Sequence, residues 1–334
     1  MKVLTIIIPS YNTEKFIDKN MKTFIDERLF ENAEVIVIND GSEDNTAAIA
    51  AEYEKKYPGY VRFINKENGG HGSVINRGIK EAAGKYFKVI DADDWVDTDG
   101  LVKLTEDLCD CNADMVINPY IKIDQNTGNT LLCGDVKAIN NEELIFKDLI
   151  NLNYRLALHS VTLKTSILRD NEIQMTEKCF YEDFEYTFYP IPYIESVVIM
   201  DYPIYFYLVG QKTQSVNASS GLKNMPMYIR VMEDSIGYYR KVKKNLNTDV
   251  ADYMKDCLSD YIRSMYNIYL RNKSTKDIYS KMMISDEKLR DISMPFYREV
   301  GKRNAYIEML RRGGYMTYVC LSIAFKIYKS REIS

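Results

Sequence analysis

The sequence predicts a three-layer α/β protein built on a parallel sheet, with a helical region following it. Three observations predict this class. Short β-branched runs alternate with helical patterns over roughly the first 90 residues, which is the βαβ order of a parallel sheet. Turn-forming glycine, asparagine and aspartate residues follow several of these runs. From about residue 220 onward, the apolar residues recur at helical spacing.

The first part of the chain contains four predicted strands, each a short apolar run: 3–8, 34–39, 60–65 and 85–90. Helices are expected between them, at about 12–25, 42–57 and 73–83. Asn12 or Thr13 is the expected cap of the first helix, and Gly84 the expected stop of the third. The next segment predicts a hairpin over 120–133, helices at 144–154, 165–169 and 181–189, and strands at 196–200 and 204–209.

The helical pattern breaks near 272–275, 294–295 and 313–314. We therefore expect two domains, a catalytic α/β domain over 1–220 and a helical C-terminal region over 221–334.

Composition excludes several classes of protein. The 334 residues carry a net charge of −4, and 46% are hydrophobic, so a strongly basic nucleic-acid binder and a disordered chain are both excluded. The six cysteines form no CxxC pair and are expected to be reduced core residues, which predicts a cytoplasmic protein. The first apolar run is too short for a signal peptide, and no run reaches the ~18 residues of a membrane span.

The charge is unevenly distributed along the chain. Residues 222–334 hold 22 Lys/Arg against 13 Asp/Glu, a net +9, whereas residues 1–221 carry −13. Near the end, the apolar stretch 315–325 follows Arg311–Arg312 and precedes Lys326. This pattern fits a helix lying on the inner face of an anionic membrane, and equally a core helix or a contact between subunits.

Two carboxylates follow the fourth predicted strand. Asp91 and Asp93 are two residues apart, so on a strand their side chains would point to the same side, while Asp94 would point away. Such a pair can hold one hard divalent cation, Mg²⁺ or Mn²⁺, with substrate phosphates completing its shell.

A glycine-rich turn over 68–73 follows the third predicted strand. It matches neither a P-loop nor a dinucleotide fingerprint, so its glycines suggest a close approach of backbone to a sugar or nucleotide. His71 in this turn could contact a ligand or bond the loop backbone, and the sequence leaves both open.

These motifs together carry a resemblance to a known family. TIIIPSYNTEKFI, EVIVINDGSEDNT, NGGHGSVINRGIKEAAGKYFKVIDADDW and FYEDFEY, in this order, resemble the inverting family 2 glycosyltransferases, which have the GT-A fold, over residues 1 to about 215. The resemblance implies transfer of a hexose or N-acetylhexosamine from a UDP-sugar to a hydroxyl of a glycan, a lipid-linked or a protein-linked acceptor.

The resemblance also implies roles for individual residues. Asp40 would pair with the nucleotide base, Asp91 and Asp93 would bind the metal, with Asp93 the more direct ligand, and Asp183 would be the catalytic base. The remaining nucleotide-pocket positions that it implies are Pro9, Tyr11, Asn12, Asn68, Gly69, Gly72, Asn76 and Ala92. A loop containing Gln214–Ser215 would close over the diphosphate, with Lys212 in place of the usual arginine.

Glu182 and Glu185 compete with Asp183 for the role of base. On a helix, residues 182 and 185 share a face and 183 lies about 100° away, so spacing alone does not choose among them. Trp95, His159, Tyr181 and Glu182 are candidates for contacts with the acceptor. Two other functions remain open: a sugar nucleotidyltransferase, and a catalytically inactive partner subunit that binds nucleotide sugars.

Overall fold

The chain divides into two compact units, residues 1–211 and 212–334, in a computed structural model. The residues that the structure describes are 2–134, 143–152, 154–210 and 218–332. Each unit has its own set of buried residues.

The first unit is built on an eight-stranded sheet with the order β3-β2-β1-β4-β10-β6-β11-β9. The first four strands in sequence are β1 (Leu4–Ser10), β2 (Ala33–Asp40), β3 (Val61–Lys66) and β4 (Tyr86–Val89). They pair in parallel, which confirms the predicted parallel βαβ core. β1, β2 and β4 are buried along their whole length because helices cover both faces of the sheet, whereas β3, at its edge, is only partly buried.

The remaining strands make the sheet mixed rather than purely parallel. They are β6 (Met115–Ile117), β9 (Glu143–Ile145), β10 (Val161–Lys164) and β11 (Ser196–Ile199). β10 runs antiparallel to both β4 and β6. The regular strand–helix alternation ends after β4, and antiparallel pairing does not require a crossover helix.

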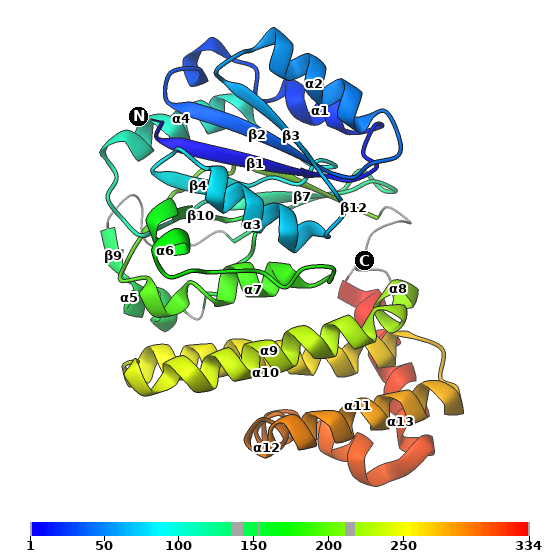
Figure 1. Ribbon diagram of the computed structural model, residues 1–334. Helices are drawn as coiled ribbons and strands as arrows, with labels where there is room; N and C mark the ends of the chain where they lie inside the picture. Colours follow the sequence, from blue (N-terminus) through cyan, green and yellow to red (C-terminus); the bar gives the residue numbers. More distant parts are fainter. Residues whose placement is uncertain (1, 135–142, 153, 211–217, 333–334) are drawn as a thin grey trace. The chain divides into compact units, whose positions relative to one another are not determined.

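Helices cover both faces of this sheet (Figure 1). Leu4, Ile6 and Ile8 of β1 pack in one cluster with residues of α1 (Ile17–Lys22), α2 (Thr46–Lys56) and α4 (Thr98–Asp110). Ile7 faces the opposite side and contacts α3 (His71–Glu81). Beside α3 lies α6 (Thr165–Asp170), whose Arg169 donates to the carbonyls that end α3. The predicted three-layer arrangement is therefore confirmed.

A smaller four-stranded sheet has the order β5-β12-β7-β8. Its strands are β5 (Trp95–Val96), β7 (Tyr120–Asp124), β8 (Thr130–Cys133) and β12 (Tyr205–Val209). β7 and β8 form the predicted hairpin, with the amide of Asp124 donating to the carbonyl of Asn129. The unit also contains η1 (Glu27–Leu29), α5 (Phe146–Asn151), α7 (Glu182–Phe188) and η2 (Ile191–Tyr193).

Three local predictions are wrong. Neither Asn12 nor Thr13 caps α1, which begins only at Ile17 and has no side-chain cap. The segment expected to be a helix from residue 144 begins instead as β9. Gly84 does not end α3 in a left-handed conformation. A Cβ there would lie 2.5 Å from the amide nitrogen of Thr5, so Gly84 serves close packing against β1.

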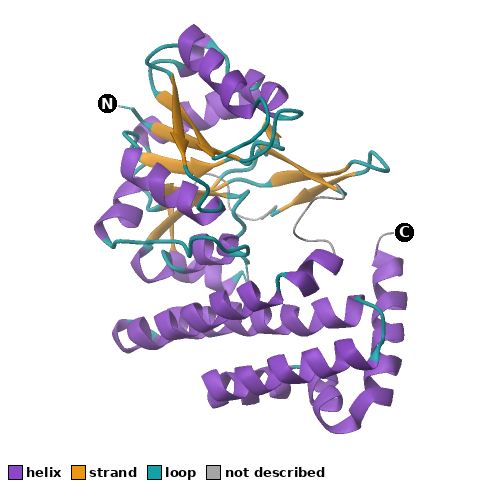
Figure 2. Cartoon of the chain, turned by 45° about the vertical axis from the view of Figure 1, so that its right-hand side comes forward, coloured by secondary structure: helices purple, strands orange, loops and turns teal. Residues whose placement is uncertain are grey.

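The second unit is helical in all its described secondary structure (Figure 2). Its elements are α8 (Ala218–Lys223), α9 (Met225–Val242), η3 (Lys243–Asn245), α10 (Thr248–Arg271), α11 (Lys276–Ile292), α12 (Met294–Arg303) and α13 (Ala305–Glu332). The three predicted breaks are confirmed between α10 and α11, at the start of α12, and at Gly314, which kinks α13 with φ 68°.

An ion pair lies inside this unit. Nε of Arg311 is 2.9 Å from Oδ1 of Asp286, and both side chains are buried. Tyr266 also donates to Asp286, and Arg311 donates to the carbonyl oxygen of Tyr297. These bonds compensate a buried guanidinium and a buried carboxylate, which would otherwise be costly.

The cysteines do not match their predicted place in the core. All six are free thiols, but only Cys179 is buried. No helix among the described residues is long and apolar enough to cross a membrane.

Two helical glycines give a matched test of the packing. A Cβ at Gly78 would lie 2.6 Å from Cγ2 of Ile7, whereas at Gly237 it would meet no atom within 4 Å. Because both residues are helical, alanine gains the same propensity at each. We expect Gly78→Ala to destabilise the first unit by about 1–3 kcal/mol. Gly237→Ala should stabilise the second by about 0.5–1 kcal/mol.

Urea unfolding followed by fluorescence and circular dichroism measures both effects. Equal stabilisation by the two substitutions would contradict the packing of α3 on β1.

Candidate active site

The site is assembled at the edge of the large sheet where the four parallel strands end. β1 ends at Ser10, β2 at Asp40, β3 at Lys66 and β4 at Val89. Because parallel strands share this edge, the loops that follow them converge, and ligands of such sheets bind there.

Asp40 organises the glycine-rich loop. Its Oδ1 accepts hydrogen bonds from Lys66 Nζ at 2.5 Å and from the Gly69 amide at 2.9 Å. Its Oδ2 accepts a bond from the Gly70 amide at 2.8 Å. Asp40 is 3% exposed, so a buried carboxylate holds the loop in place through a cation and two backbone donors.

Two glycines of this loop are needed because another segment of the backbone passes close to them. Gly70 has φ 83°, and a Cβ there would lie 3.2 Å from the backbone of Lys178. A Cβ at Gly72 would lie 2.5 Å from the carbonyl oxygen of Thr176. At Gly72 the structure thus gives the glycine a further reason, the close approach of the segment preceding α7.

Other predicted nucleotide-pocket residues also make bonds within the chain. Asn76 donates to the carbonyl of Met175 and accepts from its amide, so it fastens α3 to that segment. Asn12, with φ 52°, accepts from the amide of Glu43. Asn68 donates to the backbone carbonyl of Asp40. These side chains thus hold the rim of the site together.

Tyr11 and Pro9 lie at the end of β1. Tyr11 is 50% exposed and offers an open aromatic ring at this edge, while Pro9 is buried within the strand. A polar pocket of about 340 Å³ opens beside the glycine-rich loop. Asn68, Gly69 and Asn76 line it together with Lys66, Arg77, Lys80 and Lys178.

Asp91, Ala92 and Asp93 lie in a tight turn after β4. The amide of Asp94 donates to the carbonyl of Asp91 at 3.1 Å, and the strand itself ends at Val89. The strand alternation used to place Asp91 and Asp93 on one side therefore does not apply. Ala92 is 2% exposed, whereas both carboxylates remain partly exposed.

Asp94 is a buried member of this turn with a structural role. It accepts bonds from the Tyr205 hydroxyl and the Leu208 amide, both at 2.7 Å. Burial, and then repulsion from Asp91 and Asp93, raises the pKa of Asp94 well above its usual value. The turn thus concentrates negative charge in a small volume.

His71 bridges two carboxylates from distant parts of the chain. Its Nε2 is 3.0 Å from Oδ1 of Asp91, and its Nδ1 is 2.7 Å from Oε1 of Glu182. Burial alone would lower the pKa of His71, but the two carboxylates raise it well above its usual value. The sequence predicts either a ligand or the loop backbone as the partner of His71. In the structure its partners are the carboxylates of Asp91 and Glu182.

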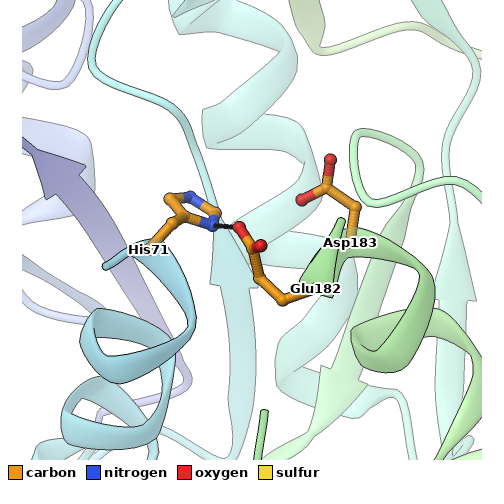
Figure 3. Close-up of side chains that lie close together, drawn as sticks. All are labelled: His71, Glu182 and Asp183. Atoms are coloured by element: carbon orange, nitrogen blue, oxygen red, sulfur yellow. Dashed lines mark ion pairs between the residues drawn. The ribbon is translucent and has the colours of Figure 1, made fainter. Parts of the chain in front are cut away.

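The three acidic side chains at the start of α7 have different surroundings. Glu182 is buried against His71, and Glu185 accepts bonds from Thr176 and Tyr189. The Asp183 side chain is exposed, and no hydrogen bond or ion pair to its carboxylate is found within the described ranges. Figure 3 shows it beside the His71–Glu182 pair. The fold therefore gives each of the three carboxylates a different environment, which their spacing along the helix did not predict.

The environment of Asp183 favours a carboxylate that can take up a proton near neutral pH. The surrounding protein disfavours the charge, and repulsion from Glu182 adds to this effect, so that the pKa of Asp183 is about 7. The Asp183 side chain is nevertheless exposed to solvent, whereas its neighbours Glu182 and Glu185 are buried.

The predicted acceptor residues are mostly engaged in packing. Trp95 stacks on Phe206, and Lys19 Nζ lies 2.9 Å from the centre of its ring. His159 precedes β10 and lies among tyrosine rings, 4.1 Å from that of Tyr207. Burial lowers the pKa of His159 to about 4.

Tyr181 is the residue before α7 and has a left-handed backbone with φ 77°. The left-handed backbone of Tyr181 thus sets the direction in which the chain enters α7, the helix that carries Asp183. The loop predicted to close over a diphosphate, with Lys212, Gln214 and Ser215, lies outside the described residues.

The fold defines the class of protein. A mixed sheet between two layers of helices, followed by a helical region, is the GT-A fold. Residues 5–169, about half of the chain, match the family described as Glycosyl transferase family 2. The chain belongs to this family.

Two curated relatives match over shorter stretches. The minor teichoic acid biosynthesis protein GgaB of Bacillus subtilis is 38% identical over 93 residues, which cover 28% of this chain and 10% of GgaB. Glycosyltransferase GlyA of Streptococcus pneumoniae is 29% identical over 125 residues, covering 37% and 18% of the two chains. The matched stretches thus span less than a fifth of either relative.

Solved structures of Staphylococcus aureus TarS share the fold. The TarS structure with UDP superposes with a TM-score of 0.69 at 17% identity, covering 98% of this chain and 91% of that one. A second TarS structure, with UDP-GlcNAc, gives a TM-score of 0.67 at 16% identity. At this identity the likeness shows the fold, which extends over both units.

The two histidines of the chain have opposite pKa shifts. We expect ¹⁵N-histidine spectra at pH 6 to show His71 doubly protonated, because its two carboxylate partners favour the charged ring. His159 should be neutral at the same pH, because its pKa lies near 4.

The spectrum of the His71→Asn variant assigns the two sets of signals, because only His159 remains in that variant. Two neutral rings at pH 6 would contradict the bridge between Asp91 and Glu182.

Proposed function

We propose that this protein is an inverting, metal-assisted glycosyltransferase that uses a UDP-sugar donor and Asp183 as its general base. The observation that carries the proposal is the state of Asp183. It is the open carboxylate of the α7 acidic group, and its pKa of about 7 suits a base that works near neutral pH.

Asp91 and Asp93 are the residues that would hold Mg²⁺ or Mn²⁺. The raised pKa of Asp94, caused by burial and by these two carboxylates, indicates a local excess of negative charge that a divalent cation would neutralise. Oxygen donors in a partly exposed turn also fit the preference of both ions. When bound, the cation would supply charge neutralisation for the departing nucleoside diphosphate.

The chain's own residues would carry out the remaining steps. Asp183 accepts the proton of the acceptor hydroxyl while that oxygen attacks the anomeric carbon of the donor sugar. The bond from the anomeric carbon to the diphosphate oxygen breaks in the same step, and UDP leaves with the bonding electrons. A single displacement of this kind inverts the anomeric configuration.

Residues at the strand ends would bind the nucleotide. Tyr11 offers an exposed ring, and the Asp40-organised loop forms the neighbouring wall with Asn68 and Gly69. The complexes of TarS with UDP and UDP-GlcNAc support a uridine nucleotide and favour an N-acetylhexosamine donor. The name of GgaB, a minor teichoic acid biosynthesis protein, supports a role in the synthesis of a teichoic acid or related surface glycan.

Removing the Asp183 carboxylate tests the mechanism. We expect Asp183→Asn to lower kcat at least about 10²-fold, because the acceptor proton then has no base. UDP affinity should remain within about twofold, since Asp183 makes no bond that shapes the nucleotide wall. Released UDP is measured with UDP-glucose, UDP-galactose, UDP-GlcNAc and UDP-GalNAc, with and without Mn²⁺.

Asp170→Asn, which removes an exposed carboxylate at the end of α6, is the matched control and should keep full activity. The wild-type rate should fall as the pH drops through about 7, because protonation removes the base. Near-normal turnover by Asp183→Asn, or no UDP release from any donor, would refute the proposal.

We further propose that the second unit binds an anionic membrane surface. Met316, Ile323 and Ile327 of α13 are 70%, 53% and 52% exposed, and their spacing places them on one helix face. Exposed Arg271, Lys273 and Lys326 lie close together where α13 packs on the end of α10. Apolar side chains beside cations fit an anionic lipid surface, and the net +9 of residues 222–334 opposes pairing of two copies.

Polar substitution of the exposed face tests this surface. We expect Ile323→Gln with Ile327→Gln to reduce binding to phosphatidylglycerol-containing vesicles at least about fivefold, because each change removes buried apolar area. Ile284→Gln, at a 55% exposed isoleucine of α11, is the matched control. Flotation and sedimentation velocity are the measurements.

Equal binding of the double variant and the control would rule out this face. Loss of a dimer on substitution, without any vesicle binding by the wild type, would show that a second copy covers it.

A further inference from the structure

His71 connects the two catalytic halves of the site. Asp91 lies in the turn after β4, on the donor side, and Glu182 lies in the first turn of α7, next to Asp183. The imidazole reaches both, at 3.0 Å through Nε2 and 2.7 Å through Nδ1. The His71 side chain is 25% exposed, so the bridge can be reached from solvent.

The position of His71 is fixed from behind. It is the first residue of α3, directly after Gly70, whose amide donates to Asp40. The next residue, Gly72, packs against the carbonyl of Thr176 with no room for a side chain. Because the loop is fixed on both sides, the position of the imidazole does not depend on Asp91 and Glu182. The imidazole can therefore hold these two carboxylates in position.

Glu182 depends on this contact. Its side chain is 6% exposed and lies 2.7 Å from Nδ1 of His71. Helix α7 begins after a left-handed Tyr181 and has no side-chain cap. Without the imidazole, the buried carboxylate of Glu182 would lose the ring nitrogen that lies 2.7 Å from it, and α7 would lose an attachment at its first turn.

We propose that His71 is a positioning residue with two separable roles, an inference that rests on the proposed function. Its Nε2 arm orients Asp91 for the diphosphate and its cation. Its Nδ1 arm fixes Glu182, and thereby holds the start of α7 and the neighbouring Asp183 at the acceptor hydroxyl. His71 itself contacts no reacting atom.

Two isosteric variants separate the arms. The amide of glutamine lies near the place of Nε2 and can still contact Asp91, whereas the amide of asparagine lies near the place of Nδ1 and can still contact Glu182. We expect His71→Gln to keep the donor KM within about twofold and to lower kcat about 10–100-fold. His71→Asn should weaken UDP binding in the presence of Mn²⁺ about tenfold or more and affect kcat less.

The readouts are steady-state UDP release, and calorimetric UDP binding with and without Mn²⁺, which requires no turnover. His71→Ala should lose both properties and serves as the reference. Melting temperatures of all variants are measured alongside, so that unfolding is recognised as such.

The outcomes are distinct. A split in which each variant loses one property supports the proposal. Equal loss of both properties by His71→Gln and His71→Asn would show a merely structural role, and wild-type behaviour of both would remove His71 from the mechanism. Failure of the proposed function is separate: wild-type protein would then release no UDP, while the calorimetric comparison would still test the Asp91 arm.

Discussion

The site depends on one constraint: most of the carboxylates at the carboxyl end of the sheet need a partner that offsets their negative charge. Carboxylates in a partly buried cleft need partners, since an unpaired buried charge is costly. Asp40 uses Lys66 and two loop amides, whereas Asp91 and Glu182 share His71. Asp183 has no such partner among the described residues, which leaves it available for chemistry.

The same bonds give the site its rigidity. The carboxylate of Asp40 holds the glycine-rich loop, and the loop starts α3 at the position where His71 reaches Asp91 and Glu182. On the far side of the turn, Asp94 is tied to Tyr205 and Leu208 of β12, which joins the small sheet to the acidic turn. The glycine-rich loop, the acidic turn after β4 and the start of α7 are therefore held by a few short polar contacts, and such preorganisation is what electrostatic catalysis requires.

Much of the architecture was predictable because it follows from local patterns. The parallel strands β1–β4, the hairpin over 120–133 and the breaks between the C-terminal helices depend on apolar periodicity and turn residues, which act over short distances. The short strand β9, where a helix was expected, was missed because its pairing with β11 depends on neighbours far away in sequence. Gly84 was misread for the same reason, since the atoms it must avoid belong to β1.

The sequence by itself determined which residues gather at the sheet edge, because strand order and the loops after each strand follow from the βαβ pattern. The family resemblance added the prediction that Asp40, Asp91 and Asp183 belong to the site. Only the tertiary structure decided their surroundings: Glu182 turns inward to His71, and Asp183 stays open. The physical reason is that burial and charge pairing depend on contacts between segments about a hundred residues apart, which spacing along one helix or strand does not encode.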